Sequence, residues 1–230
     1  MQTHETLPHT FNDPLKTTLK RFCIVVVFGI AFAYIEAAVV VYLRTIFHPD
    51  GFTFPLTTFG MGPLWKRLLL TEIGREAATI VLIFTASALI GRNIRQKCAY
   101  FMAIFAVWDI FYYVWLKVLL DWPASIMDWD ILFLIPLVWA SPVLYPILIS
   151  ITLLIFAAVI LYRESCDRPL RVTPVDWFFF SLAGLIVVVS FCIPGPHITG
   201  PDYESYFYWP LFALGNISAV VVFAGCLLKS

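Results

Sequence analysis

Long stretches of predominantly apolar residues alternate with shorter polar stretches along this chain. A helix needs about 20 mostly apolar residues to cross the hydrocarbon core of a bilayer. The stretches are apolar on nearly all sides, whereas a strand of a membrane barrel would alternate apolar and polar positions. The pattern therefore predicts six transmembrane helices, at residues 22–43, 72–90, 97–120, 130–162, 175–192 and 208–228.

The fourth stretch is unusual because it is longer than one straight span requires. At 1.5 Å per residue, a helix over residues 130–162 would exceed the thickness of the bilayer. Pro136, Pro142 and Pro146 lie within this stretch. Each proline removes an intrahelical hydrogen bond, so we expect the fourth helix to be kinked or broken.

Composition supports the same class of protein. The chain is 61% hydrophobic and only 13% charged, which excludes an ordinary soluble domain. Its formal net charge is zero, so nothing indicates a nucleic acid as a partner. The five cysteines form no CxxC pair and predict neither a disulfide framework nor a zinc site. We expect an all-α, polytopic membrane protein whose main partner is the lipid bilayer.

The placement of basic residues predicts the topology. Lysine and arginine gather before the first predicted helix, after the second and the fourth, and after the last. Such residues normally stay in the cytoplasm. We therefore expect both termini in the cytoplasm, and a membrane of the bacterial cytoplasmic type. Residues 1–20 would form a polar cytoplasmic tail, residues 21–230 one transmembrane domain, and residues 45–71 a long outer loop. Arg44, Lys66 and Arg67, in or beside that loop, fit this pattern poorly.

Several carboxylates lie within the predicted helices, where an ionised group is costly unless it is paired, hydrated or protonated. Asp109 is near the middle of the third helix. Alternating helix directions bring five acids to the outer half of the bundle, namely Glu36, Glu72, Glu76, Asp109 and Asp130. The sequence thus predicts an acidic pocket there. Arg75 would serve as its counter-charge, and Tyr112 and Tyr113 as contacts for a substrate.

This acidic pocket has three interpretations. In the first, the five acids bind a cation, such as a divalent metal ion, through their oxygen atoms. In the second, Glu76 or Asp109 is a catalytic acid or base, and Arg75 holds an anionic group. In the third, the charges satisfy one another and only fix the packing of the helices.

The leading hypothesis for function is an integral membrane protein whose outer-half pocket binds a cation or a polar headgroup, with catalysis on that ligand as an extension. The alternative is a non-catalytic subunit that pairs with other membrane subunits through residues 175–192 and 208–228. A proton-coupled carrier of small solutes ranks third. A carrier needs a polar route across the whole bilayer, and the cytoplasmic halves of the helices carry only mildly polar groups.

The predicted topology can be tested by labelling with a membrane-impermeant thiol reagent in intact cells. In a variant without the five native cysteines, the Arg92→Cys site should stay unlabelled, because its basic connection is expected to face the cytoplasm. The Asp202→Cys site should be labelled from outside. The opposite pattern would place the acidic pocket on the cytoplasmic side.

Overall fold

The computed structural model describes residues 14–49, 51–56 and 65–230. Its long helices are α1 (Pro14–Phe47), α2 (Trp65–Ile90), α3 (Ile94–Leu120), α4 (Leu144–Ser165), α5 (Pro174–Cys192) and α6 (Trp209–Leu228). Two short strands and two 3-10 helices lie between them, β1 (Trp129–Phe133), β2 (Trp139–Pro142), η1 (Gly195–His197) and η2 (Tyr203–Tyr206). The predicted tail up to residue 13, and residues 57–64 of the predicted outer loop, lie outside the described residues.

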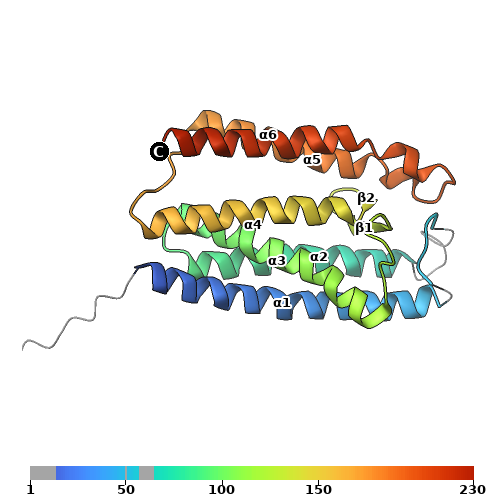
Figure 1. Cartoon of the computed structure of the whole chain (residues 1–230). Coiled ribbons are helices and arrows are strands. Elements are labelled where there is room, and N and C mark those ends of the chain that lie inside the picture. Colours follow the sequence, from blue (N-terminus) through green and yellow to red (C-terminus); the bar gives the residue numbers. More distant parts are fainter. Residues whose placement is uncertain (1–13, 50, 57–64) are drawn as a thin grey trace, which may run out of the picture.

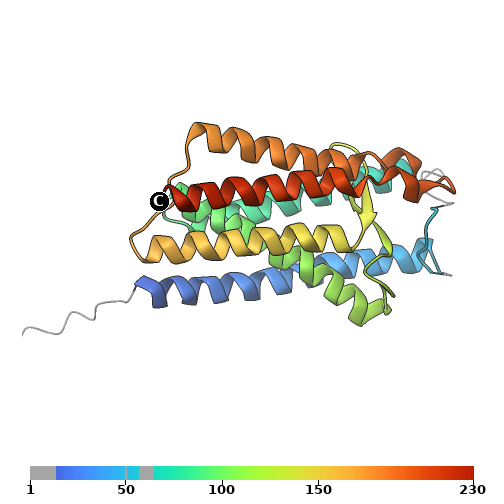
Figure 2. The same ribbon diagram turned by 45° about the horizontal axis from the view of Figure 1, so that its top comes forward.

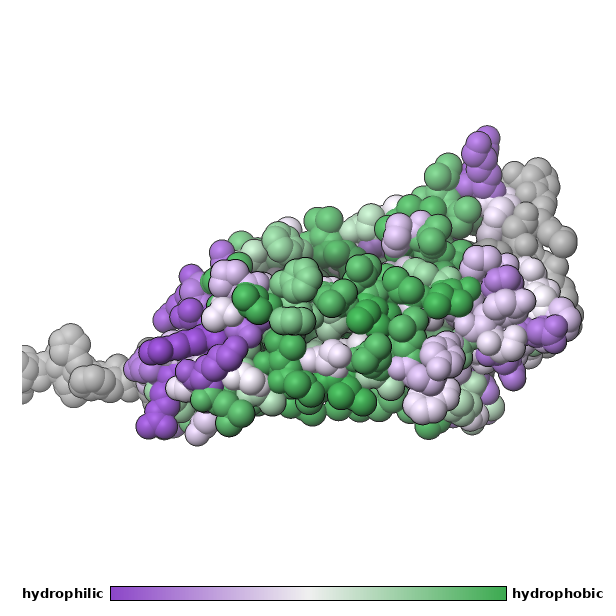
Figure 3. Space-filling model, turned by 90° about the horizontal axis from the view of Figure 1, so that it is seen from above, coloured by the Kyte–Doolittle hydropathy of each residue, from purple (hydrophilic) through white to green (hydrophobic). Residues whose placement is uncertain are grey.

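The surface and the helices together have the character of a multi-pass membrane protein. In the described part of the chain, six helices are long and apolar enough to cross a membrane. Figure 3 shows a broad apolar belt on one face of the molecule, with hydrophilic residues gathered at its two ends. Strongly exposed apolar side chains of the long helices include Leu89, Leu185 and Ile217. The predicted all-α, polytopic membrane fold is confirmed at this level.

The connections gather at two opposite ends of the bundle. One end, called the basic end here, holds the start of α1, the connections at residues 91–93 and 166–173, and the C-terminus (Figures 1 and 2). The other, the hairpin end, holds the connections from α1 to α2, α3 to α4 and α5 to α6. The start of α1 and the C-terminus thus lie at the same end. Which end faces the cytoplasm stays a prediction.

The predicted fourth helix over residues 130–162 is the main correction to the fold. Its first part belongs to an antiparallel hairpin of β1 and β2, and α4 begins only at Leu144. The prolines explain the difference, because Pro136 and Pro142 cannot donate the backbone hydrogen bonds that a continuing helix needs. Pro146 lies in the first turn of α4, where a missing N–H is tolerated. The stretch is therefore a hairpin followed by a helix, and not one long helix with a kink.

The other helix bounds differ at their polar ends. The first helix extends from Pro14 to Phe47, beyond the predicted residues 22–43, and the second begins at Trp65 instead of residue 72. Hydropathy marks only the part of a helix inside the hydrocarbon, so it misses turns that continue into the interface. The predicted outer loop is correspondingly shorter, because only residues 48–64 separate the two helices.

The helices pack as two layers. Helix α3 contacts α1, α2 and α4, and these four form the first layer. The close approach of α1 to α3 requires Gly29, since a Cβ atom there would lie 2.8 Å from Cγ1 of Val107. The second layer is the α5–α6 pair, which lies above α4 in Figure 1. The layers meet through the stacked rings of Phe156 and Phe223, whose centroids are 4.0 Å apart.

The contact between α5 and α6 yields a test with a matched control on one helix. A Cβ atom at Gly215 would lie 2.9 Å from the backbone oxygen of Ala183, whereas a Cβ atom at Gly225 would meet nothing within 4 Å. We expect Gly215→Ala to lower the free energy of unfolding by about 1–3 kcal/mol, through overpacking. Gly225→Ala should be neutral or slightly stabilising. Thermal unfolding in detergent measures both, and equal effects would contradict this packing.

Candidate functional site

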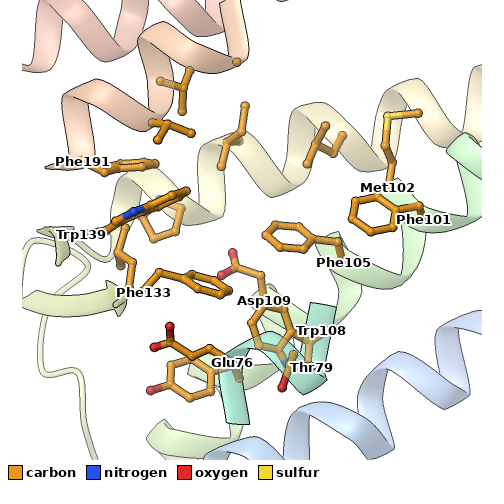
Figure 4. Close-up of a pocket in the computed structure, with 18 of the residues that line it drawn as sticks. Glu76, Thr79, Phe101, Met102, Phe105, Trp108, Asp109, Phe133, Trp139 and Phe191 are labelled. Atoms are coloured by element: carbon orange, nitrogen blue, oxygen red, sulfur yellow. The ribbon is translucent and has the colours of Figure 1, made fainter. Parts of the chain in front are cut away.

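A long cavity lies between the two layers of the bundle. Its volume is about 930 Å³, near the upper end of the range of roughly 300–1,000 Å³ that is typical of small-molecule sites. All six long helices and both strands contribute to its wall. Most of this wall is apolar, with Phe101, Met102 and Phe105 of α3 forming a row along one side (Figure 4).

The polar residues of the wall are concentrated toward the hairpin end. They include the predicted residues Glu36, Glu72, Arg75, Glu76, Asp109, Tyr112, Tyr113 and Asp130. At its other end the cavity reaches Arg95, Lys97 and Leu170. Between these ends the lining is largely aromatic and aliphatic. The structure therefore places every predicted site residue along one cavity that is polar at the hairpin end and apolar in the middle.

Arg75 joins three of the polar side chains into a network between α1 and α2. Its Nε donates a hydrogen bond to Oε2 of Glu72 at 2.9 Å. The guanidinium also forms an ion pair with Glu36. The second carboxylate oxygen of Glu36 accepts a hydrogen bond of 2.8 Å from the hydroxyl of Thr79. The positive charge of Arg75 is therefore taken up by two acids of the protein.

A second ion pair links α1 to the hairpin. Nη2 of Arg44 donates to Oδ1 of Asp130 at 2.9 Å, and both side chains are buried. The guanidinium also lies over the rings of Phe52 and Trp122, 4.0 Å and 3.8 Å from their centroids. Burial raises the pKa of Asp130 to about 6, and the charge of Arg44 opposes this rise. The charge of Arg44 therefore favours the ionised form of the carboxyl group with which it pairs.

Glu76 and Asp109 are held by neutral donors. Oε2 of Glu76 accepts a hydrogen bond of 2.8 Å from the backbone N–H of Leu134, in the hairpin. Oδ2 of Asp109 accepts one of 2.8 Å from the hydroxyl of Ser150 on α4. Among the described residues neither acid forms an ion pair with lysine or arginine. Figure 4 shows their carboxylates on two sides of the Phe133 ring.

The two tyrosines expected as substrate contacts line the same part of the cavity. The rings of Tyr112 and Tyr113 meet edge to face, with centroids 5.1 Å apart. Tyr113 also packs against Trp122, the ring that covers Arg44. These tyrosines therefore form part of the wall between the Arg44 ion pair and the apolar middle of the cavity.

The predicted metal ligands do not meet at one point. In residues 14–49, 51–56 and 65–230, no group of three or more His, Cys, Asp or Glu side chains could hold a metal ion. The five acids are instead distributed over three separate arrangements, around Arg75, around Arg44, and against the neutral donors of Leu134 and Ser150. The predicted acids are therefore not gathered into one metal-binding group in the described part of the chain.

Sequence reasoning missed several residues of the site. Arg44 appeared only as a basic residue that fitted the topology poorly, yet it is the partner of Asp130. Thr79 and Ser150 each donate a hydrogen bond to a predicted acid. Leu134 was missed because residues 130–162 were expected to form a helix. Only the three prolines of that stretch signalled an interruption.

The Arg44–Asp130 pair can be tested by a double-mutant cycle. Removing one partner of a buried ion pair leaves an uncompensated charge, at a cost of about 3–5 kcal/mol. We expect Arg44→Met or Asp130→Leu to lower the free energy of unfolding by about this amount, and the double variant to recover a large part of it. Lys117→Met, in an exposed ion pair with Asp121, should change little. Strictly additive effects of the first two changes would contradict the pairing.

Comparison with known proteins assigns the chain to no family. No family model matches it, and neither a curated protein nor a solved structure matches it. The function of the cavity must therefore be inferred from its own shape and chemistry.

Proposed function

We propose that this protein binds one lipid-like amphiphile in the cavity between its two layers. The apolar part of the ligand would lie along Phe101, Met102 and Phe105, and its headgroup would lie at the hairpin end beside Glu76 and Asp109. The observation that carries this proposal is a cavity of about 930 Å³ that is apolar in the middle and carries its acidic side chains toward one end. Ligand sites generally combine an apolar wall with a few convergent polar groups.

An opening between α2 and α5 supports the proposal. Phe84 of α2 is 63% exposed and Trp177 of α5 is 51% exposed, and both also line the cavity. Gly184 of α5 is exposed and lines it as well. From these residues, which are exposed and also line the cavity, we infer a lateral opening between α2 and α5, called the portal here. In a bilayer the portal would face lipid, so an amphiphile could enter without crossing water.

The orientation that we propose for this site follows the distribution of basic residues. Lysine and arginine crowd the basic end, namely Lys16, Lys20, Arg21, Arg92, Arg95, Lys97, Arg163, Arg168, Arg171 and Lys229. Such residues favour the cytoplasmic side of a membrane. The hairpin end, and with it the headgroup site, would then face the outer side.

The other hypotheses are supported less well. A carrier for ions or small solutes needs polar groups along its whole path, and the middle of this cavity is lined by residues such as Phe105, Leu153 and Phe156. Catalysis by Glu76 and Asp109 would be a further property of the same headgroup site. For the role of a non-catalytic subunit, the exposed apolar faces of α5 and α6 offer no feature beyond what contact with lipid requires.

Native mass spectrometry of the intact protein tests the proposal. We expect a bound mass of lipid size, with a stoichiometry of one, that survives mild removal of the detergent. Gly184→Trp should reduce the bound fraction several-fold, because the indole would occupy the portal. Gly225→Trp is the matched control, since a Cβ atom at either glycine meets nothing within 4 Å and Gly225 does not line the cavity. Absence of a bound mass, or equal binding by both variants, would contradict the proposal.

A further inference from the structure

At the hairpin end of the cavity the arginines have partners of opposite charge, whereas two of the acids do not form an ion pair among the described residues. Both arginines of this region, Arg44 and Arg75, are engaged by acids of the protein. The carboxylates of Glu76 and Asp109 have only neutral donors, the N–H of Leu134 and a serine hydroxyl. A headgroup that reaches this place therefore meets two acids that form no ion pair among the described residues, and two arginines that are already paired.

Glu76 is not an ordinary solvated surface acid. It is only 7% exposed, and its carboxylate lies in the wall of the cavity. Charged side chains are seldom buried to this extent without a partner of opposite charge. Asp109 lies nearby on α3, partly exposed to the same space. A ligand of positive charge would supply the partner that the described residues lack.

Aromatic rings surround the two carboxylates. Trp108 contacts Phe105 and Phe133, with ring centroids 5.5 Å and 6.2 Å away, and Phe133 contacts Trp139 at 5.6 Å. All four rings line the cavity. The faces of such rings attract ammonium groups, whereas an anionic headgroup would gain nothing from them. The rings and the carboxylates thus favour the same charge.

An unsatisfied donor of the same wall points to a ligand as well. Trp108 is 7% exposed, and its indole N–H has no hydrogen-bond partner among the described residues. The indole N–H of Trp139 is in the same situation. Buried donors normally have an acceptor, so each exception calls for an explanation. An oxygen atom of a ligand, next to its positive group, would be a suitable acceptor.

We propose that the ligand of this cavity is a long-chain amine, with its protonated amino group in the part of the cavity that Glu76 and Asp109 line and a neighbouring hydroxyl oxygen toward Trp108. At the hairpin end the headgroup carries no phosphate, because neither Arg44 nor Arg75 is free to receive one there. This inference rests on the proposed function, since it presumes that the apolar chain occupies the cavity. It adds the chemical class of the headgroup.

The test compares chain-matched probes on the full-length protein in detergent, by competition in native mass spectrometry. The probes are hexadecylamine, 2-amino-1-hexadecanol, hexadecanol and hexadecyl sulfate, all at neutral pH. We expect hexadecylamine to bind about tenfold or more tightly than hexadecanol, because a charged hydrogen bond contributes more than a neutral one. The amino alcohol should bind at least as tightly as the amine, and the sulfate most weakly.

Variants connect this preference to the two carboxylates. Glu76→Gln and Asp109→Asn should each reduce the ratio of amine to alcohol affinity, while binding of the alcohol stays nearly unchanged. Asp202→Asn, at an exposed acid of the hairpin end outside the cavity, should leave the ratio as it is. The probe preference of the unmodified protein is a test in itself, should a variant fail to fold.

The outcomes separate the two proposals. Equal binding of amine and alcohol, or tighter binding of the sulfate, would overturn the amine headgroup and leave the lipid-like ligand standing. A preference for the amine that persists in both variants would also overturn it. Failure of every probe to bind would overturn the proposed function itself.

Discussion

The structure depends on the pairing of charges that cannot stay alone inside a bilayer. An ionised side chain within the hydrocarbon is tolerated when it meets an opposite charge or several hydrogen-bond donors. Here that requirement ties α1 to two other elements, since Arg44 binds Asp130 of the hairpin and Glu36 binds Arg75 of α2. Glu76 extends the connection by accepting the N–H of Leu134. The same contacts that hold the hairpin between the helices therefore form the polar end of the cavity.

The helical part of the fold could be predicted from the sequence because a bilayer sets both the length and the apolar character of a span. The hairpin could not. Residues such as Ile131, Leu132 and Phe133 are compatible with a buried helix and equally with a buried strand, and a short apolar run does not distinguish the two. Tertiary contacts decide between helix and strand here, because the strands pair with each other and the hairpin receives contacts from Arg44 and Glu76. Pro136 and Pro142 were visible, but they indicate only that a helix is interrupted.

The site could be predicted in outline for a similar reason. Alternating helix directions place Glu36, Glu76 and Asp109 in the same half of the bundle, and the structure finds them along one cavity. Which donor serves which acid depends on helix rotation and on the hairpin, so Ser150 and Arg44 were not assigned to their acids in advance. The cavity itself is a property of how two layers fit together. No pattern of residues within one segment encodes it.

The lateral position inferred for the portal, between Phe84 and Trp177, would determine what sets the occupancy of the cavity by the proposed ligand. A ligand that arrives sideways is drawn from the lipid phase, where a sparingly soluble molecule is far more concentrated than in water. Saturation then follows the mole fraction of the ligand among its neighbouring lipids, with abundant acyl chains as its competitors. Under the proposed function, the occupancy of the cavity would therefore respond to the composition of the membrane.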